Sequence, residues 1–146
     1  MADMNATVQA FYAAIERRDR AALLQLLDPN AEWNSAENFL YAEHNPYIGA
    51  EKVIGILRQV DQDWSTFSMR PLETFVAGET AIVRGRYKGK LKATGFGLDA
   101  EFVHMLYFQD GRLVTGRSYT DTAQFRDAVR QLSRPEPAES PSTISA

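Results

Sequence analysis

The pair Asp110-Gly111 stands between two apolar segments, residues 101–109 and 112–120. Asp-Gly allows the positive φ angles that a type I′ turn needs at both central positions, and this turn matches the twist of paired strands. We therefore predict that the two segments form an antiparallel hairpin. The rest of the fold has to be arranged around this hairpin.

His104 lies in the middle of the first predicted strand of the hairpin. Because side chains of a strand alternate between two faces, His104 shares its face with Phe102, Leu106 and Phe108. An ionisable ring among large apolar side chains is either a hydrogen-bonded core residue or part of a binding site. In an apolar pocket beside a carboxylate, a histidine can carry a proton at neutral pH and act as an acid or base.

Asp121 closes the second predicted strand, just before a helical pattern over residues 122–132. At the rim of a pocket its carboxylate can orient His104. With Gln124 three residues later, it also fits the capping box at the start of a helix. The two roles are compatible, and the sequence leaves both open.

Only one face of the second strand can line a pocket. One face carries Arg117, Tyr119 and Asp121, and the other carries Gly116, Ser118 and Thr120. Both Ser118 and Tyr119 therefore remain candidate binding residues.

The composition excludes several classes of function. The net charge of −3 comes from interspersed acids and bases, which argues against a nucleic-acid surface. There is no cysteine, hence no disulfide or thiolate site, and the two histidines, His44 and His104, belong to no cluster with metal-ligand spacing. No apolar run approaches the ~20 residues of a membrane span. We expect a cytoplasmic protein that needs neither a metal nor another cofactor.

Three helices are predicted in the first half of the chain. Residues 5–18 place apolar side chains along one face of a helix, and Phe11 on that face is a further candidate binding residue. Asp19 is positioned to cap a second, shorter helix, and the apolar period returns from Ala50 to about residue 63. These helices precede most of the predicted strands.

A brief strand at residues 31–34 leads into the irregular segment 35–49, and a loop of this length in a small domain is typically functional. Aromatic side chains at the mouth of a pocket would stack on a flat apolar ligand, and Asn34 or Glu37 would orient or deprotonate it. The alternative is that the aromatics fill the core and Glu37 is solvated. The candidate binding residues of this region are Trp33, Asn34, Tyr41 and Tyr47.

The predicted order, helices first and then four strands in a meander, is typical of an α+β fold. Residues 67–76, with a bulge at Pro71, and 80–90 supply the two strands before the hairpin. We expect a strongly curved antiparallel sheet with three helices on its concave face and a short C-terminal helix, leaving a hydrophobic pocket. This domain spans residues 1–133, and the Pro- and Ser-rich residues 134–146 form a disordered tail.

The order of elements resembles the nuclear-transport-factor-2-like superfamily, and more narrowly its SnoaL-like and ketosteroid-isomerase-like branch. The resemblance runs from about residue 5 to residue 132, through VQAFYAAIERRD, PNAEW and DGRLVTGRSYTDTAQF. It implies a cone-shaped α+β barrel, a pocket closed by the first and third helices, and a homodimer packed through the outer face of the sheet. It does not imply one reaction, since the superfamily holds isomerases, cyclases, hydratases, epoxide hydrolases and non-catalytic modules.

The steroid isomerases of this superfamily supply a test residue by residue. Their oxyanion tyrosine corresponds to Phe11, which has no hydroxyl, and their base falls at Asn34 or Ser35. Their protonated aspartate corresponds to His104. The resemblance therefore does not imply a steroid isomerase.

Two other branches match better at Asp121. The epoxide hydrolases need an Asp-Arg-Asp set, and the arginines Arg84 and Arg86 have no acid beside them. Polyketide-cyclase-like members combine a pocket histidine with an aspartate at the end of the last strand, which His104 and Asp121 match.

We expect a homodimer that binds a small hydrophobic molecule and, as an enzyme, performs cofactor-free proton transfer such as isomerisation, cyclisation or hydration. His104 would be the acid or base, Asp121 or Glu37 the second carboxylate, and Tyr41 or Asn34 a donor to the developing oxyanion. The alternative is a non-catalytic binding module. A His104 ring against a carboxylate and open to a cavity would favour the enzyme, and a fully packed ring would favour the module.

Overall fold

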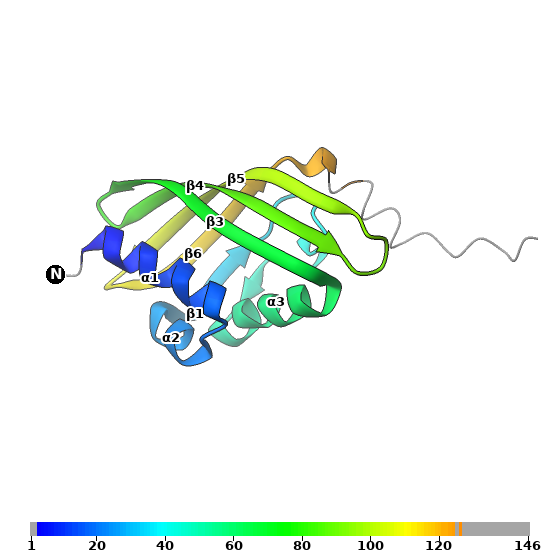
Figure 1. The fold of residues 1–146 in the computed structure, drawn as a ribbon. Helices are drawn as coiled ribbons and strands as arrows, with labels where there is room; N and C mark the ends of the chain where they lie inside the picture. The colour runs from blue at the N-terminus through cyan, green and yellow to red at the C-terminus, as the bar shows by residue number, and fades with distance from the viewer. Residues whose placement is uncertain (1–2, 125, 127–146) are drawn as a thin grey trace, which may run out of the picture.

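The computed structural model of the protein describes residues 3–124 and 126. Three α-helices cover one face of a six-stranded sheet (Figure 1). In chain order the elements are α1 (Met4–Arg17), α2 (Arg20–Leu26), β1 (Leu27–Asn34), the 3-10 helix η1 (Ala42–His44), β2 (Tyr47–Ile48), α3 (Ala50–Asp63), β3 (Trp64–Ala77), β4 (Thr80–Leu91), β5 (Gly97–Gln109) and β6 (Arg112–Thr120).

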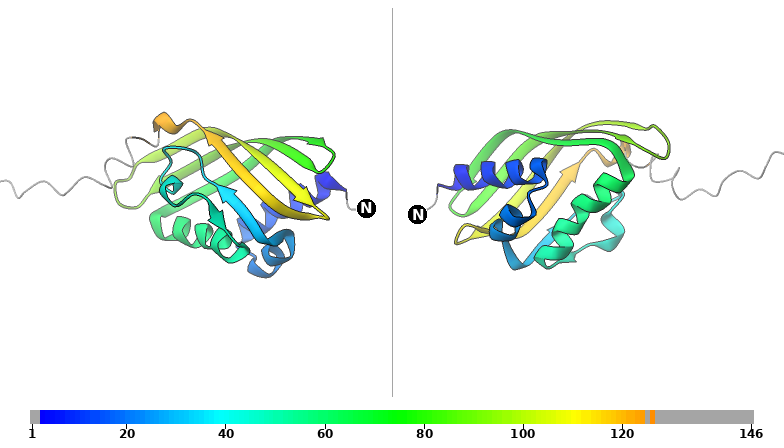
Figure 2. Two further views of the ribbon diagram at one scale, coloured as in Figure 1. Left: turned by 180° about the vertical axis from the view of Figure 1, so that it is seen from behind. Right: turned by 60° about the horizontal axis from the view of Figure 1, so that its bottom comes forward.

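The strands are ordered β2-β1-β6-β5-β4-β3 across the sheet. The predicted meander is the antiparallel series β3 to β6, and β1 joins it by pairing parallel to β6. The α+β class and the helices on one face are confirmed. The described strands nevertheless form an open mixed sheet, without the closure or strong curl of a cone-shaped barrel (Figure 2).

The hairpin of β5 and β6 forms as its turn chemistry predicts. Asp110 and Gly111 both have positive φ, 52° and 78°, and Gln109 pairs with Arg112 across the turn. A register shift in β3 follows Pro71, where a proline removes a donor from the ladder. The local signals for turn and bulge are therefore confirmed.

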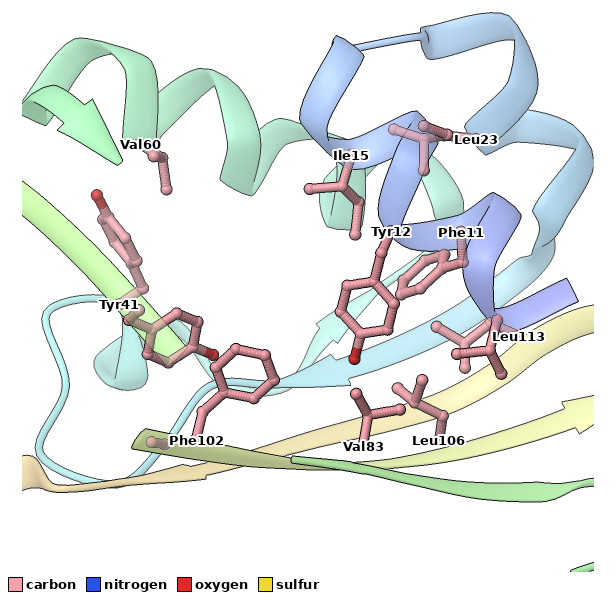
Figure 3. Packing of buried hydrophobic residues seen from close by; sticks show 14 of the residues in the cluster. Phe11, Tyr12, Ile15, Leu23, Tyr41, Val60, Val83, Phe102, Leu106 and Leu113 are labelled. Atoms are coloured by element: carbon pink, nitrogen blue, oxygen red, sulfur yellow. The ribbon is translucent and has the colours of Figure 1, made fainter. Parts of the chain in front are cut away.

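Helices α1 and α2 meet at a sharp corner. Arg18 ends α1 in the left-handed region at φ 55°, and the Asp19 side chain accepts a hydrogen bond from the Ala22 amide at the start of α2. At the other end of α1, the Asp3 side chain caps the helix by accepting a hydrogen bond from the Asn5 amide. The apolar face of α1, which includes Phe11, is buried against the sheet (Figure 3).

The inner face of the hairpin is decided by a bulge in β6. The register shifts between the pairs Tyr107–Thr115 and Phe108–Leu113, so that Leu113, Gly116 and Ser118 all face the helices. A side chain at Gly116 would not fit, because its Cβ would lie 2.3 Å from the Trp33 ring. The small residues of β6 therefore line the interior.

Residues 122–124 are helical, and most of the predicted C-terminal helix and the predicted tail of residues 134–146 lie outside the described residues. In the described part of the chain no helix covers the outer face of the sheet, which exposes large apolar side chains such as Phe75, Ile82 and Tyr119 (Figure 2). None of the helices described is long and apolar enough to span a membrane.

Candidate functional site

His104 is completely buried between α1 and the sheet and is held at both ring nitrogens. The Tyr12 hydroxyl oxygen lies 2.7 Å from Nδ1, and the Tyr87 hydroxyl oxygen lies 2.6 Å from Nε2. The Phe102 ring stacks on the imidazole with a centroid distance of 4.1 Å, and Trp33 meets it edge-on at 5.2 Å. The ring is therefore fixed in both position and orientation.

The hydrogen bonds continue from Tyr87 to Ser118, with 2.8 Å between the two hydroxyl oxygens. A neutral imidazole offers one donor and one acceptor. In the described part of the chain the Tyr12 hydroxyl has no partner other than His104, so its hydrogen has an acceptor only if it donates to Nδ1. Nε2–H then donates to Tyr87, and Tyr87 donates to Ser118. The hydroxyl hydrogen of Ser118 remains free for a further partner.

Burial keeps every side chain of this hydrogen-bond chain neutral. It lowers the pKa of His104 to about 3, because the imidazolium would lose its hydration. It raises the pKa of Tyr12, with a smaller contribution from Tyr87, and it raises the pKa of Tyr87 as well. No carboxylate among residues 3–124 contacts the imidazole, so nothing compensates a charge on it. His104 is therefore uncharged at neutral pH.

A cavity of about 90 Å³ lies beside this hydrogen-bond chain, between α1, α3 and the inner face of the sheet. Tyr87 and Ser118 form part of its wall, and His104 lies behind them. Within the described ranges, no Asp, Glu, Lys or Arg side chain lines it. The lining residues are Phe11, Ile15, Leu23, Leu27, Trp33, Ser35, Phe39, Tyr41, Val53, Ile54, Ile56, Leu57, Val60, Phe67, Met69, Tyr87 and Ser118.

Comparison with known families fits this architecture. A family model described as the SnoaL-like domain matches residues 8–116, from α1 into β6. The chain belongs to the SnoaL-like family. No curated protein matches this SnoaL-like chain.

Solved structures share the fold over nearly the whole chain. An NTF2-like protein from Burkholderia thailandensis E264 is 27% identical with a TM-score of 0.79, and the alignment covers 92% of this chain and all of that one. A protein described as a SnoaL-like polyketide cyclase from Jannaschia sp. CCS1 is 16% identical, with a TM-score of 0.72 and 90% and 92% of the two chains covered. TerC, co-crystallized with polyporic acid, is 21% identical, with a TM-score of 0.74 and coverage of 87% and 98%. The last two show the fold alone.

Four of the predicted binding residues of this SnoaL-like protein come together on the cavity wall. Phe11 reaches it from α1, Trp33 from β1, Tyr41 from the loop and Ser118 from β6. Their roles in binding stay predictions, whereas their shared position is a feature of the structure.

Two other predicted binding residues lie beside the cavity. Tyr47 lines a surface cleft of about 320 Å³ behind Tyr41, and its hydroxyl donates to the Tyr41 carbonyl at 2.7 Å. The Asn34 amide donates to Glu32 at 2.9 Å and does not reach the cavity wall.

The predicted carboxylates do not meet His104. Asp121 is exposed and accepts hydrogen bonds from the Ala123 amide at 3.2 Å and from the Gln124 side chain at 3.1 Å, as a helix cap does. Glu37 is exposed in the loop and does not line the cavity. Tyr119 is 54% exposed on the opposite face of the sheet, because alternation along β6 turns it away from Ser118.

Sequence reasoning did not identify the two tyrosines that hold His104. Tyr12 belongs to the apolar stripe of α1, and Tyr87 shares the inner face of β4 with Val83. A signal was available, because a buried tyrosine needs a partner for its hydroxyl and His104 is the ionisable residue predicted on the inner face.

The loop wall of the cavity is tied to the end of α3. The Tyr41 hydroxyl donates to Asp63 at 2.9 Å and accepts from the Trp64 indole at 3.2 Å. Burial, followed by the interaction with Asp63, raises the pKa of Tyr41. The Tyr41 hydroxyl is therefore used in holding the loop to the end of α3, and the Tyr41 ring forms part of the cavity wall.

Proposed function

We propose that this protein binds a small, largely apolar molecule whose enclosed part is uncharged. The observation that carries the proposal is the wall of the cavity, which is apolar except for hydroxyls and contains no ionisable acid or base among the described residues. An ionised group inside it would lose hydration without gaining a counter-charge. Aromatic side chains, Trp33 and Phe11 among them, suit a flat ligand.

Ser118 is a polar group of the wall that is placed to orient such a ligand. Its oxygen accepts from Tyr87 in the hydrogen-bond arrangement assigned above, so its hydrogen is available to a ligand acceptor. A carbonyl oxygen fits this position, because it accepts a hydrogen bond and carries no proton of its own. The ligand class we propose is therefore an apolar molecule with a carbonyl or similar acceptor.

The second candidate function is cofactor-free proton transfer on such a ligand. It is favoured by the chain Tyr12–His104–Tyr87–Ser118, which runs from the core to the cavity wall. A donor held at that wall would stabilise an enolate-like oxygen. Because His104 is fully packed and no carboxylate reaches it, binding without catalysis is the function the geometry favours.

The relatives are consistent with a small-molecule ligand. TerC was co-crystallized with polyporic acid, and the Jannaschia protein is described as a polyketide cyclase. We propose a homodimer as well, through the outer sheet face, where Phe75 and Ile82 are paired neighbours and both exposed.

A matched pair of probes tests the proposed binding. Acetophenone and α-methylstyrene share one shape, but only the ketone accepts a hydrogen bond. We expect both probes to shift the NMR signals of Trp33 and Tyr87. Ser118→Ala should weaken the binding of acetophenone about fivefold and leave the binding of α-methylstyrene unchanged, because one hydrogen bond is worth about 1 kcal/mol. Ser68→Ala, in an exposed serine of β3 outside the cavity, is the control. Absence of binding by either probe would refute the proposal.

A further inference from the structure

The cavity adjoins the surface between α2 and α3 at three apolar side chains. Leu23, Ile54 and Leu57 line the cavity and also line a surface cleft of about 420 Å³. Helices α2 and α3 lie next to each other on the same side of the sheet (Figure 2, right view). Ile54 and Leu57 are only half-buried. The cavity and the surface cleft therefore meet at this seam between α2 and α3.

The surface cleft is strongly basic. Four cations line it, Arg18, Arg20, Arg58 and Lys92, against the single acid Asp61. Two of these cations are already paired. Arg18 bonds Asp61 at 2.9 Å, and Arg20 forms a two-point ion pair with Glu51.

The other two cations keep donors free. Arg58 forms no hydrogen bond or ion pair with any described residue, and both oxygens of the nearby Glu51 are bonded to Arg20. The Lys92 ammonium donates once, to the Asp61 carbonyl at 3.1 Å. Arg58 still interacts with Glu51 and Lys92 with Asp61, but each of these acids already has an arginine partner, so the cleft keeps an excess of positive charge.

Two further clefts that share lining residues with the cavity lack this excess of cations. The cleft behind Tyr41 contains the acids Glu43 and Asp63. The groove between α1 and β3 has one acid, Glu16, for two cations, of which Arg18 is already paired. The excess of cations distinguishes the α2–α3 cleft from these two.

The size of the cavity requires a ligand to extend. About 90 Å³ is less than the ~150 Å³ of an apolar cavity that takes benzene, and far below the ~300 Å³ or more of ordinary ligand pockets. Even a single aromatic ring must therefore displace part of the lining, and the half-buried Ile54 and Leu57 are the side chains that a small shift of α3 would move. Through that opening the ligand reaches the basic cleft.

We infer that the ligand of the cavity is an amphiphile whose anionic group, such as a carboxylate, binds Arg58 and Lys92 in the cleft between α2 and α3. This inference rests on the proposed function, since the apolar part of the ligand occupies the cavity. Arg58 supplies a planar pair of donors that matches a carboxylate, and Lys92 adds a second charge. The anion stays at the surface, where its desolvation is small.

A matched acid and alcohol test the inference. 4-Phenylbutyrate and 4-phenylbutan-1-ol share a ring and linker, and only the first is an anion. We expect the acid to bind the intact protein about three- to tenfold more tightly in calorimetric or NMR titration, and to lose this preference in Arg58→Gln. Added salt should weaken the binding of the acid and leave the binding of the alcohol unchanged. Lys52→Gln removes an exposed cation of the same helix that does not line the cleft, and it should keep the preference.

The outcomes separate this inference from the proposed function. If acetophenone binds and the acid shows no preference, or keeps its preference in Arg58→Gln, the anion site is refuted and the cavity stands. If acetophenone binds but neither phenylbutyl probe does, the opening at the seam is refuted. If acetophenone itself does not bind, both the proposed function and this inference fail.

Discussion

Tyr87 stands between His104 and the cavity: its hydroxyl oxygen lies 2.6 Å from Nε2 of the histidine, and its ring forms part of the cavity wall. The imidazole is therefore not part of the cavity wall. Whatever His104 does for a ligand, it does by fixing the Tyr87 hydroxyl and, through it, Ser118. The histidine is a positioning residue in this arrangement.

Removing the Tyr87 hydroxyl should destabilise the fold. In Tyr87→Phe, Nε2–H of His104 loses its acceptor inside the core, and an unsatisfied buried donor costs about 1–3 kcal/mol. The measurement is the free energy of unfolding from urea titrations. Tyr119→Phe, which changes an exposed tyrosine on the other face of the sheet, should leave that free energy unchanged. Equal stability of the two variants would show that the hydrogen-bond chain is unimportant for the fold.

His104 should remain neutral well below its ordinary pKa. Its pKa is about 3 in the folded protein and about 6.5 in an unfolded chain, so between these values only the unfolded state binds the proton. The free energy of unfolding should therefore fall as the pH is lowered from about 6.5 toward 3, by up to about 1.4 kcal/mol per pH unit from this residue. Stability that rises on acidification would contradict the assignment.

Imidazole nitrogen NMR gives a direct measurement of the same state. In His44→Gln only one histidine remains, and its spectrum should show the Nε2–H tautomer with no titration down to pH 5. A Nδ1–H tautomer would reverse the direction of the hydrogen-bond chain.

The sequence predicted those features that depend on local chemistry. The turn at Asp110-Gly111 and the position of His104 among the apolar residues of β5 follow from short-range rules of φ and alternation. The partners of His104 could not be predicted this way. Tyr12 is 92 residues away in the chain and approaches only when α1 packs across the sheet, and Tyr87 is 17 residues away on β4.

The shape of the sheet depends on long-range pairing as well. β1 pairs parallel to β6 although α3 and four strands lie between them in the chain, and no local signal in residues 27–34 specifies that partner. This pairing brings Trp33 beside Gly116 and so builds one wall of the cavity.

Gly116→Ala should damage that wall. The new Cβ would lie 2.3 Å from the Trp33 ring, so the ring or the strand must move, and such overpacking costs about 1–3 kcal/mol. We expect a lower free energy of unfolding and a shifted indole NMR signal for Trp33. Gly97→Ala is the control, because no atom lies within 4 Å of its added Cβ. A Trp33 signal as undisturbed in Gly116→Ala as in the control would mean that the two residues are not in contact.

Asp121→Ala should separate the capping role from a role in the site. The sequence left both open, and in the structure the carboxylate contacts the Ala123 amide and the Gln124 side chain, with no path to His104. Loss of an N-cap typically costs about 1 kcal/mol, so the free energy of unfolding should fall slightly and acetophenone binding should not change. The affinity for acetophenone should fall in Ser118→Ala and not in Asp121→Ala. A comparable loss of affinity in both variants would place Asp121 at the cavity and would restore the carboxylate–histidine pair that the resemblance to polyketide cyclases implied.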